Sequence, residues 1–416
     1  MSKLVLKKSK HLQGEISING AKNSALPILA ATLLTDGNCT LHSIPPLADV
    51  DNMCQLISDL GYQIERNDLS YQIMPKKLST LKTSYETTNK LRASFLVSGP
   101  LLAKHGQVQI SYPGGCPIGN RPVDLHLKGF ELLGAKIEKK HGFIDIKCDE
   151  LKGNKIYLDF PSVGATENLL MTASLAKGQT IIENAAVEPE IVDLTNFLNS
   201  MGAEIIGSGT DTIKINGVER LTGTVHTVIP DRIEAGTYMV AAAMTKGQVK
   251  INQIICDHLR PVSAKLREIG VEVTEDQDSI LVNGDGASFK PADIKTLPYP
   301  GFPTDMQAPF ASLFSLVKGT SIITETIFEN RFLHMGELKR MGANIKVEGR
   351  TAVIEGTKLS GTKVKATDLR AGAALVLAGL CANGETQVED CEHITRGYYN
   401  FEENLNALGA KVIRID

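Results

Sequence analysis

Two glycine markers recur six times along the chain in the same phase, and this repetition constrains the fold more than any other feature. The first marker is an apolar residue, a glycine and a small or apolar residue, as in Met201-Gly202-Ala203. Its glycines lie 67 to 73 residues apart, at Gly61, Gly134, Gly202, Gly270, Gly342 and Gly409. The second marker is a glycine that precedes a β-rich stretch, 23 to 28 residues earlier, at Gly37, Gly106, Gly178, Gly247, Gly319 and Gly384. A shared period indicates an internal structural repeat, and six copies account for nearly all 416 residues.

Each copy has the pattern of a small α/β unit. The early glycine is followed by a short strand such as Thr180–Asn184, and then by an amphipathic helix such as Val192–Met201. The next glycine is expected to end this helix as a C-cap, because a left-handed backbone is well tolerated only without a Cβ. Alternating strands follow, and then an Ala-rich helix without a polar face, as at Gly236–Met244 and Ala371–Ala382, which is expected to be buried. The pattern predicts six βαβ-like units. The alternative is that Leu-Gly-Ala is only a common helix stop.

The length and the repeat together predict the division of the chain. A chain of 416 residues is long enough for two to three domains, each with its own core. A boundary is expected near Val228–Asp231, after the third copy. The N-terminal strand, residues 1 to about 21, could pair with either half.

Composition and charge exclude several classes of protein. The chain is 42% apolar and 22% charged, with 44 basic and 47 acidic residues, so it has no basic surface suited to nucleic acid or to an anionic membrane. Its longest apolar run, Ala371–Ala382, is too short to span a bilayer, and the charged N-terminus lacks the apolar core of a signal peptide. Seven cysteines without paired spacing do not form a disulfide pattern. We therefore expect a cytoplasmic protein with reduced thiols, without nucleic-acid or membrane partners.

Charged residues occupy equivalent positions in several copies. One position, the expected first turn of the Ala-rich helix, holds Lys22, Arg92, Arg232, Asp305 and Arg370. The other, in the expected loop before the amphipathic helix, holds Asp49, Glu190, Arg260, Arg331 and Arg396. Helix N-termini favour anions, and a cation placed there needs compensation, for which an anionic ligand is the simplest source. The positions predict a converging site for phosphate and carboxylate groups. The alternative is that they form caps and ion pairs between helices.

The segment Tyr112–Pro122 differs in composition from the rest of the chain. Three glycines and three prolines in eleven residues exclude a helix or a central strand, and leave Cys116 in an exposed loop. A thiol near Arg121 is expected to be more acidic and more reactive than an ordinary cysteine. The alternative is an incidental loop cysteine.

This loop and six further segments resemble one enzyme family. Gly114–His126 closely resembles the active-site loop of the UDP-N-acetylglucosamine 1-carboxyvinyltransferases. Matching segments extend along the whole chain: Asn19–Pro27, Pro161–Thr166, Glu183–Asp193, Pro303–Gln307, Phe328–Arg331 and Ala366–Arg370. The resemblance implies an α/β fold, the inverse α/β barrel of the EPSP synthase type, with two domains of three βαβαββ repeats each. It further implies a first domain at 22–229 that carries the cysteine loop, a second domain at 1–21 plus 230–416, and an active site in the cleft between them.

The resemblance also implies a reaction. The family transfers the enolpyruvyl group of phosphoenolpyruvate to the 3′-hydroxyl of UDP-N-acetylglucosamine and releases phosphate, in the first committed step of peptidoglycan synthesis. The implied partners are these two small molecules and covalent inhibitors such as fosfomycin, which alkylates the loop cysteine. No cofactor and no metal are implied.

Residue by residue, the resemblance assigns roles to this chain. The implied catalytic residues are Cys116 as general acid and site of a covalent adduct, Asp305 as base for the sugar hydroxyl with help from Asp368, and the cations Lys22 and Arg396. The implied phosphoenolpyruvate-binding residues are Lys22, Asn23, Arg121, Arg331, Arg370 and Arg396. The implied nucleotide-sugar residues are Arg92, Arg121, Pro122, Val123, Asp124, Leu125, Ser162, Val163, Gly164, Asp305 and Ile327. Several of these coincide with the charged positions found from the repeat.

Three other functions compete with this prediction. The shikimate-pathway enolpyruvyl transferase shares the implied fold and donor but lacks the Gly-Gly-Cys loop. A non-catalytic paralogue that binds a nucleotide sugar is a second alternative, although every expected catalytic residue is present. A P-loop protein is disfavoured because neither glycine-rich nucleotide motif occurs in the chain.

Overall fold

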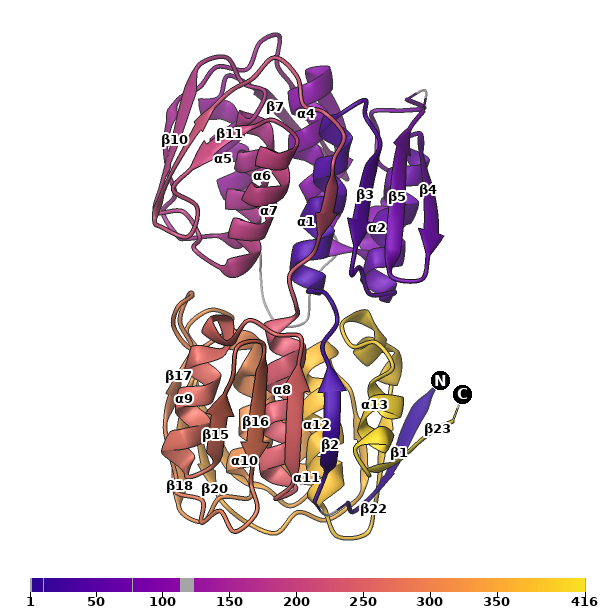
Figure 1. Cartoon of the computed structure of the whole chain (residues 1–416). Coiled ribbons are helices and arrows are strands. Elements are labelled where there is room, and N and C mark those ends of the chain that lie inside the picture. The colour runs from indigo at the N-terminus through magenta and orange to yellow at the C-terminus, as the bar shows by residue number, and fades with distance from the viewer. Residues whose placement is uncertain (1, 10, 77, 113–122, 416) are drawn as a thin grey trace. The chain divides into compact units, whose positions relative to one another are not determined.

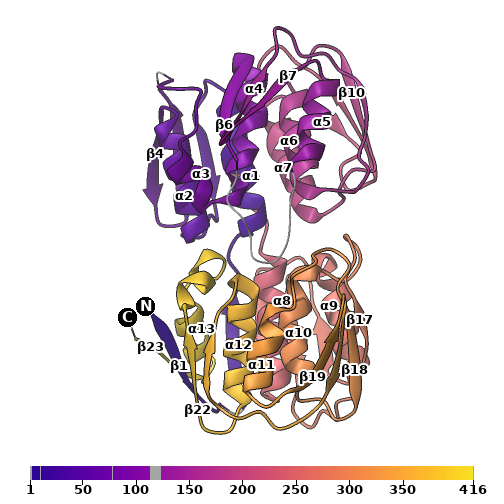
Figure 2. The ribbon, with the colours of Figure 1, turned by 180° about the vertical axis from the view of Figure 1, so that it is seen from behind.

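The computed structural model describes residues 2–9, 11–76, 78–112 and 123–415, which form two compact units. The first unit contains the described residues between 20 and 229, and the second contains those of 2–19 and 230–415. Each unit has three sheets arranged around a set of buried helices, as Figures 1 and 2 show from opposite sides.

The third repeat shows the construction most simply. Its elements are β9 (Lys155–Tyr157), α6 (Val163–Ala173), β10 (Gln179–Glu183), α7 (Pro189–Ser200), β11 (Glu204–Ile206) and β12 (Thr212–Asn216). Helix α6 connects β9 to the parallel strand β10, and α7 leads to the antiparallel pair β11 and β12. Thr180 lies opposite Ile215 and Ile182 opposite Ile213, and all four side chains are buried. The alternation of apolar and polar residues therefore sets which face of the sheet meets the helices.

The other two repeats of the first unit follow the same plan. The first contains α1 (Lys22–Ala31), β3 (Cys39–His42), α2 (Ala48–Asp59), β4 (Tyr62–Asn67) and β5 (Ser70–Pro75), and β13 (Val225–Thr227) joins its sheet, in the order β13-β3-β5-β4. The second contains α3 (Tyr85–Lys90), a 3₁₀ segment η2 (Arg92–Val97), α4 (Ser98–His105), β6 (Gln107–Ser111), α5 (Asp124–Leu132), β7 (Lys136–Lys140) and β8 (Phe143–Lys147), with sheet order β6-β8-β7.

The second unit contains the remaining three repeats. The fourth has β2 (Gln13–Ser17), α8 (Arg232–Met244), β14 (Gln248–Asn252), α9 (Arg260–Ile269), β15 (Glu272–Glu275) and β16 (Ser279–Asn283). The fifth has β17 (Ile294–Lys295), the 3₁₀ turn η4 (Thr304–Met306), α10 (Gln307–Phe314), β18 (Thr320–Thr324), α11 (Leu333–Arg340), β19 (Asn344–Glu348) and β20 (Thr351–Glu355). The sixth has β21 (Lys363–Lys365), α12 (Leu369–Cys381), β22 (Glu385–Glu389), the 3₁₀ segment η5 (Cys391–Arg396), α13 (Phe401–Ala407) and β23 (Lys411–Ile415).

Three strands complete sheets of repeats that are distant in the sequence. The first strand, β1 (Lys3–Lys7), lies between β22 and β23 and is antiparallel to both. Strand β2 precedes α1 along the chain but pairs with β14, whereas β13 (Val225–Thr227) precedes α8 but pairs with β3. Both N-terminal strands therefore pair within the second unit.

The Ala-rich helices are buried, as their lack of a polar face predicts. Every residue of α10 is buried, and so are all residues of α12 from Arg370 to Leu380. In the first unit, a Cβ at Gly99 of α4 would lie 2.3 Å from Oδ1 of Asn168 in α6, so only glycine permits this close helix contact. The same oxygen accepts a hydrogen bond from the Gly99 amide at 2.9 Å. Small residues allow the helices to pack as the interior of each unit, with the sheets outside.

The glycines of the first marker end the amphipathic helices, which confirms the predicted C-caps. All six have φ between +92° and +111°, in the range that favours glycine. After α5, the Gly134 amide donates to the Glu131 carbonyl and the Ala135 amide to the Phe130 carbonyl, which is the Schellman arrangement. The same pair of hydrogen bonds recurs after α7, α9, α11 and α13.

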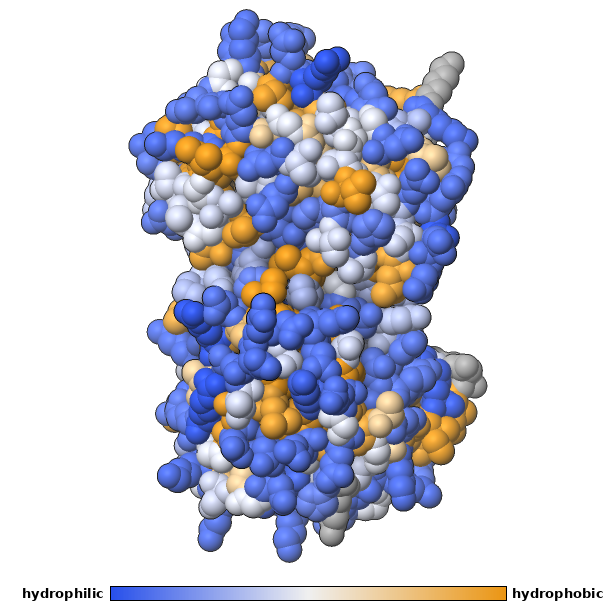
Figure 3. Space-filling model, in the orientation of Figure 1, coloured by the Kyte–Doolittle hydropathy of each residue, from blue (hydrophilic) through white to orange (hydrophobic). Residues whose placement is uncertain are grey.

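The surface has no large continuous apolar area on the face that Figure 3 shows. Apolar residues form small separate groups there, one of them over β1 and β23 near the chain ends, where Ile413 and Ile415 are exposed. Within the described residues, no helix is long and apolar enough to cross a membrane.

Candidate functional site

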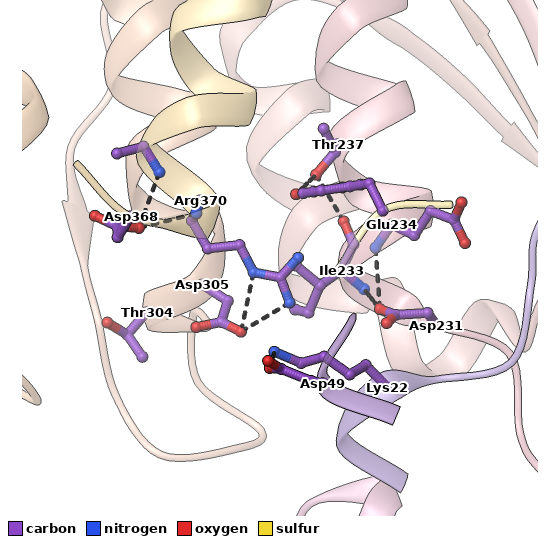
Figure 4. Close-up of polar contacts among 12 residues, drawn as sticks. Lys22, Asp49, Asp231, Ile233, Glu234, Thr237, Thr304, Asp305, Asp368 and Arg370 are labelled. Carbon is purple, nitrogen blue, oxygen red and sulfur yellow. Dashed lines mark hydrogen bonds and ion pairs between the residues drawn. The ribbon is translucent and has the colours of Figure 1, made fainter. Parts of the chain in front are cut away.

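A carboxylate and two buried arginines form the centre of the candidate site in the second unit. Asp305 lies in η4, immediately before α10, and Figure 4 shows Arg370 of α12 pointing toward it. Oδ2 of Asp305 lies 3.2 Å from Nη2 and 3.3 Å from Nε of Arg370, and Oδ1 lies 2.5 Å from Nη2 of Arg331. The arginine side chains are 4% exposed or less, whereas that of Asp305 is 24% exposed. The two guanidinium groups share one carboxylate, so a second anion could be accommodated beside them.

Arg370 is the most constrained of these groups. Burial disfavours its charged form, but Tyr398, Asp305 and Asp231 outweigh burial, so the pKa of Arg370 is raised. Its guanidinium lies 5.2 Å from the centre of the Tyr398 ring. Nη1 of Arg370 is buried and has no hydrogen-bond partner among the described residues. A buried donor without an acceptor is costly, and an anionic ligand would supply the acceptor.

Asp368, for which the resemblance implies help to the base, caps a helix in the structure. It is the N-cap of α12, where Oδ1 accepts hydrogen bonds from the amides of Arg370 at 2.9 Å and Ala371 at 3.0 Å (Figure 4). This cap places Arg370 in the first turn of the helix. Asp231 caps α8 in the same manner, through the amides of Ile233 and Glu234. Arg370 at the start of α12 contacts Asp305 just before α10, so these two helix starts of the second unit meet, as the repeat predicts.

Arg396 and Ile327 lie on segments that pack near this centre. Arg396 ends η5, a segment that packs against the start of α12: a Cβ at Gly397 would lie 2.7 Å from the Leu369 side chain. The amide of Ile327 donates to Oε1 of Glu325 at 2.8 Å. Contacts therefore join Asp305, Arg331 and Arg370 directly. The Ile327 amide is connected to Arg331 by hydrogen bonds through Glu325 and Thr304.

In the first unit, the predicted cation Lys22 is paired with a carboxylate. Lys22 is the first residue of α1, and its Nζ lies 3.2 Å from Oδ2 of Asp49 in α2; both residues are buried (Figure 4). For Lys22 the fold itself supplies a compensating carboxylate, which is the ion pair that the alternative interpretation of these positions predicts. Binding of an anionic ligand by Lys22 stays a prediction. Asp49 and Glu190 were also predicted in loops, but they lie in the first turns of α2 and α7, because these helices begin earlier than expected.

The predicted nucleotide-sugar residues of the first unit surround His126. This half-buried histidine follows Val123–Leu125 at the start of α5, and a Cβ at Gly164 of α6 would lie 3.3 Å from its Cε1. Burial, and then the charge of Arg92, lower the pKa of His126 to about 3. Nδ2 of Asn168 lies 3.0 Å from its Nδ1, so the neutral ring accepts at Nδ1 and carries its proton on Nε2. The structure thus brings three separated parts of the predicted set together.

Three predicted residues, Cys116, Arg121 and Pro122, lie outside the described residues. Two buried residues of the second unit were missed by sequence reasoning, Glu325 and His334. Burial, partly offset by the charge of Asp368, lowers the pKa of His334 to about 4. The only sequence signal for Glu325 is weak: the equivalent position, six residues after the early glycine, also holds a polar residue in four other copies, at Ser43, Asn184, Gln253 and Asp390.

No group of three or more His, Cys, Asp and Glu side chains in the described part of the chain is arranged to hold a metal ion. The contacts described above join charged and hydrogen-bonding side chains at or near helix starts. Such groups bind and orient phosphate and carboxylate substrates.

Two units of buried helices enclosed by sheets are the fold of solved enolpyruvyl transferases. The chain belongs to the EPSP synthase (3-phosphoshikimate 1-carboxyvinyltransferase) family, whose sequence profile matches residues 6–405. Within this family, it is similar to proteins named UDP-N-acetylglucosamine 1-carboxyvinyltransferase. It is 58% identical over 414 residues to one from Caldanaerobacter subterraneus subsp. tengcongensis, covering 99% of both chains, and 57% identical over the full length of both to one from Carboxydothermus hydrogenoformans.

Solved structures with low sequence identity have the same fold. The enolpyruvyl transferase NikO from Streptomyces tendae matches with a TM-score of 0.90 at 22% identity, over 99% of this chain and 98% of that one. An EPSP synthase from Acinetobacter baumannii matches with a TM-score of 0.79 at 20% identity, over the full length of both chains. The predicted fold class and the family resemblance are confirmed.

Proposed function

We propose that this protein transfers the enolpyruvyl group of phosphoenolpyruvate to the 3′-hydroxyl of UDP-N-acetylglucosamine and releases phosphate, the first committed step of peptidoglycan synthesis. The observation that carries the proposal is the identity of 57% to 58%, over almost the whole chain, to proteins named for this transfer. The buried arginines around Asp305 support it, because phosphoenolpyruvate carries both a phosphate and a carboxylate.

The proposed roles are those that the family resemblance implies, and the positions of the described side chains support some of them. Arg331 and Arg370 bind the anionic groups of phosphoenolpyruvate, and Nη1 of Arg370 gains the acceptor that it lacks in the described structure. Lys22, Asn23, Arg121 and Arg396 complete the proposed anion-binding set. In a site that excludes water, each of these charges stabilises the substrate more than it would on a surface.

Asp305 is the proposed base for the sugar hydroxyl, with help from Asp368. In the described structure both oxygens of Asp305 accept hydrogen bonds from arginine, which stabilises its ionised form. When phosphoenolpyruvate draws Arg331 and Arg370 toward its own oxygens, Asp305 becomes freer to accept the hydroxyl proton. Binding of the donor would thus activate the base.

Cys116 is the proposed general acid. It gives a proton to the methylene carbon of phosphoenolpyruvate while the sugar oxygen attacks the neighbouring carbon, and the tetrahedral product then loses phosphate and a methyl proton. This sequence balances the protons without a cofactor or a metal. The same thiol is the proposed point of attack for fosfomycin.

The nucleotide sugar is proposed to bind Arg92, the start of α5 at Val123–Leu125, the start of α6 at Ser162–Gly164, and Ile327. The convergence of the first three groups around neutral His126 supports this assignment. We further propose the cytoplasm as the place of action, without nucleic-acid or membrane partners.

Phosphate release from phosphoenolpyruvate tests the proposed function. Purified protein is assayed with UDP-N-acetylglucosamine, with shikimate 3-phosphate, and with neither. Release only with the nucleotide sugar is expected. Release with shikimate 3-phosphate would instead support the other transferase of the family. Release with neither acceptor, together with tight binding of the nucleotide sugar, would indicate a non-catalytic paralogue.

The role of Cys116 is tested by two substitutions. Cys116→Ser is expected to abolish multiple turnover, because a serine hydroxyl is far too weak an acid, whereas Cys116→Asp restores an acid and is expected to retain part of the rate. Both rates are measured by phosphate release under the same conditions. A fully active serine variant would refute the acid role.

A further inference from the structure

Glu325 is a buried carboxylate that the proposed reaction does not use. It follows β18 and is 1% exposed. Oε1 accepts three hydrogen bonds, from Oγ1 of Thr296 at 2.9 Å and from the amides of Ile327 at 2.8 Å and Phe328 at 3.1 Å. Oε2 accepts one, from Oγ1 of Thr304 at 2.8 Å. A buried ionisable group with four donors is fully engaged, so its location is fixed by the surrounding segments.

The hydrogen bond from Thr304 to Glu325 determines how the Thr304 hydroxyl interacts with Arg331. The Thr304 hydroxyl donates its only proton to Glu325, so its oxygen can only accept from other groups. It accepts from Nη1 of Arg331 at 3.0 Å, while Nη2 of Arg331 donates to Oδ1 of Asp305 at 2.5 Å. The guanidinium plane of Arg331 is therefore held at two points, one of which depends on Glu325.

The hydrogen bonds from the Ile327 and Phe328 amides to Glu325 hold a second segment in place. Because Oε1 accepts both backbone amides, it fixes the loop that carries Ile327 and leads to Arg331. One carboxylate thus sets the turn that holds Asp305, the orientation of Arg331 and the loop of Ile327.

We propose that Glu325 is a positioning residue for the transfer reaction, which acts through the Thr304 hydroxyl to hold Arg331 in the orientation that binds phosphoenolpyruvate beside Asp305. The inference rests on the proposed function and adds to it a residue that does not touch the substrate.

A matched pair of threonines separates positioning from general stabilisation. Thr296 and Thr304 each donate to one oxygen of Glu325 and accept one N–H. The two threonines differ in the group that donates to them. Thr296 accepts from the backbone amide of Thr326, at 2.9 Å, whereas Thr304 accepts from the guanidinium of Arg331. Replacing either by valine removes the same two hydrogen bonds and keeps the branched shape.

The test compares steady-state phosphate release by wild type, Thr304→Val, Thr296→Val and Thr304→Ser. Thr304→Val is expected to lower kcat/KM for phosphoenolpyruvate about tenfold or more, because a charged hydrogen bond that orients Arg331 is lost. Its KM for UDP-N-acetylglucosamine is expected to stay within about twofold of wild type, since the bonds of Glu325 to the Ile327 loop remain. Thr304→Ser restores the hydroxyl and is expected to restore most of the rate, and Thr296→Val is expected to stay within about twofold.

Equal losses in Thr304→Val and Thr296→Val would overturn the inference, as would an unchanged Thr304→Val, because either result makes Glu325 a structural residue only. Thermal unfolding of both valine variants shows whether they are equally stable.

If Thr304→Val does not fold, Glu325→Gln is the second variant. Its amide cannot accept at both positions, so an unchanged kcat/KM for phosphoenolpyruvate would overturn the inference, whereas a loss of about tenfold in kcat/KM with near-native unfolding supports it. Wild-type protein that releases no phosphate with UDP-N-acetylglucosamine would refute the proposed function and the inference together; an active wild type with equal variants refutes the inference alone.

Discussion

Replacing Glu234 by Gln is expected to make the protein less sensitive to rising pH. Glu234 lies in the first turn of α8 and is 3% exposed. Burial, and then the neighbouring charge of Asp231, raise its pKa from 4.5 to about 8. The backbone amide and the side-chain amide of Asn19 donate to its two oxygens, at 3.2 and 3.3 Å, and oppose this shift only in part.

The direction of the effect follows from proton binding. Between pH 4.5 and about 8, the folded protein keeps the Glu234 proton and the unfolded chain releases it. The folded state therefore binds more protons, and the free energy of unfolding falls as the pH rises. Each pH unit corresponds to about 1.4 kcal/mol, so about 3 kcal/mol of stability is lost between pH 4.5 and pH 7. Gln does not titrate and avoids this loss, although one weakened hydrogen bond to Asn19 costs about 1 kcal/mol at every pH.

Urea unfolding at several pH values between 4.5 and 7.5 measures this difference. The chain has no tryptophan, so far-UV circular dichroism follows the transition, and hydrogen exchange of α8 assigns it to the second unit. The free energy of unfolding of Glu234→Gln, relative to wild type, is expected to rise by about 3 kcal/mol from pH 4.5 to pH 7. Glu403→Gln, at an exposed glutamate in the first turn of α13, is the control and is expected to show no such change. A pH-independent difference for Glu234→Gln would refute the reasoning.

Two further predictions concern the stability of the first unit. Asp193→Asn is expected to lower the free energy of unfolding by about 1 to 3 kcal/mol, because this buried carboxylate accepts hydrogen bonds from Ser24, His226 and the Ile229 amide. The control in the same urea assay is Asp149→Asn, at an exposed site. Equal effects of the two substitutions would contradict the prediction. Gly134→Ala is expected to cost about 1 to 2 kcal/mol through its φ of +102° alone, since the nearest atom to the new Cβ lies at 3.6 Å. Gly336→Ala, in a helix of the second unit with open space around the Cβ, is the matched control and is expected to raise thermal stability slightly; a gain at both glycines would contradict the backbone argument.

Much of the fold could be predicted because its signals are local. A glycine that ends a helix is needed at the residue where φ becomes positive, so the six markers indicate helix ends wherever the helices lie in space. The Ala-rich helices are predictable for a similar reason, since a helix without a polar face must be buried. Small errors remained at the helix starts, where Asp49 and Glu190 fall inside the helix, because local sequence limits a boundary only to within a turn.

The sequence predicted which charged residues form the site, but not which residues form ion pairs with them. Equivalent positions in the repeat identified Lys22, Asp305, Arg331 and Arg370, which the structure places at or next to helix starts. The sequence did not indicate that Asp49 neutralises Lys22, or that both arginines bind one carboxylate. An ion pair depends on a separation of a few ångströms between side chains that are far apart in the sequence, and no local pattern contains that distance.

The sequence by itself determined the number of repeats, the helix ends, the buried helices and the residues from which a site for anions could be built, because each depends on a few neighbouring residues. The residue pattern left the N-terminal strand open, and only the family resemblance assigned it to the second domain. The tertiary structure decided which strands pair: β1 with β22 and β23, β2 with β14, and β13 with β3. It also decided that Glu325, which in sequence is an ordinary polar residue after a strand, is buried with four donors around it. Strand partners and buried hydrogen-bond networks depend on the path of the whole chain, and only the folded structure brings their members within bonding distance.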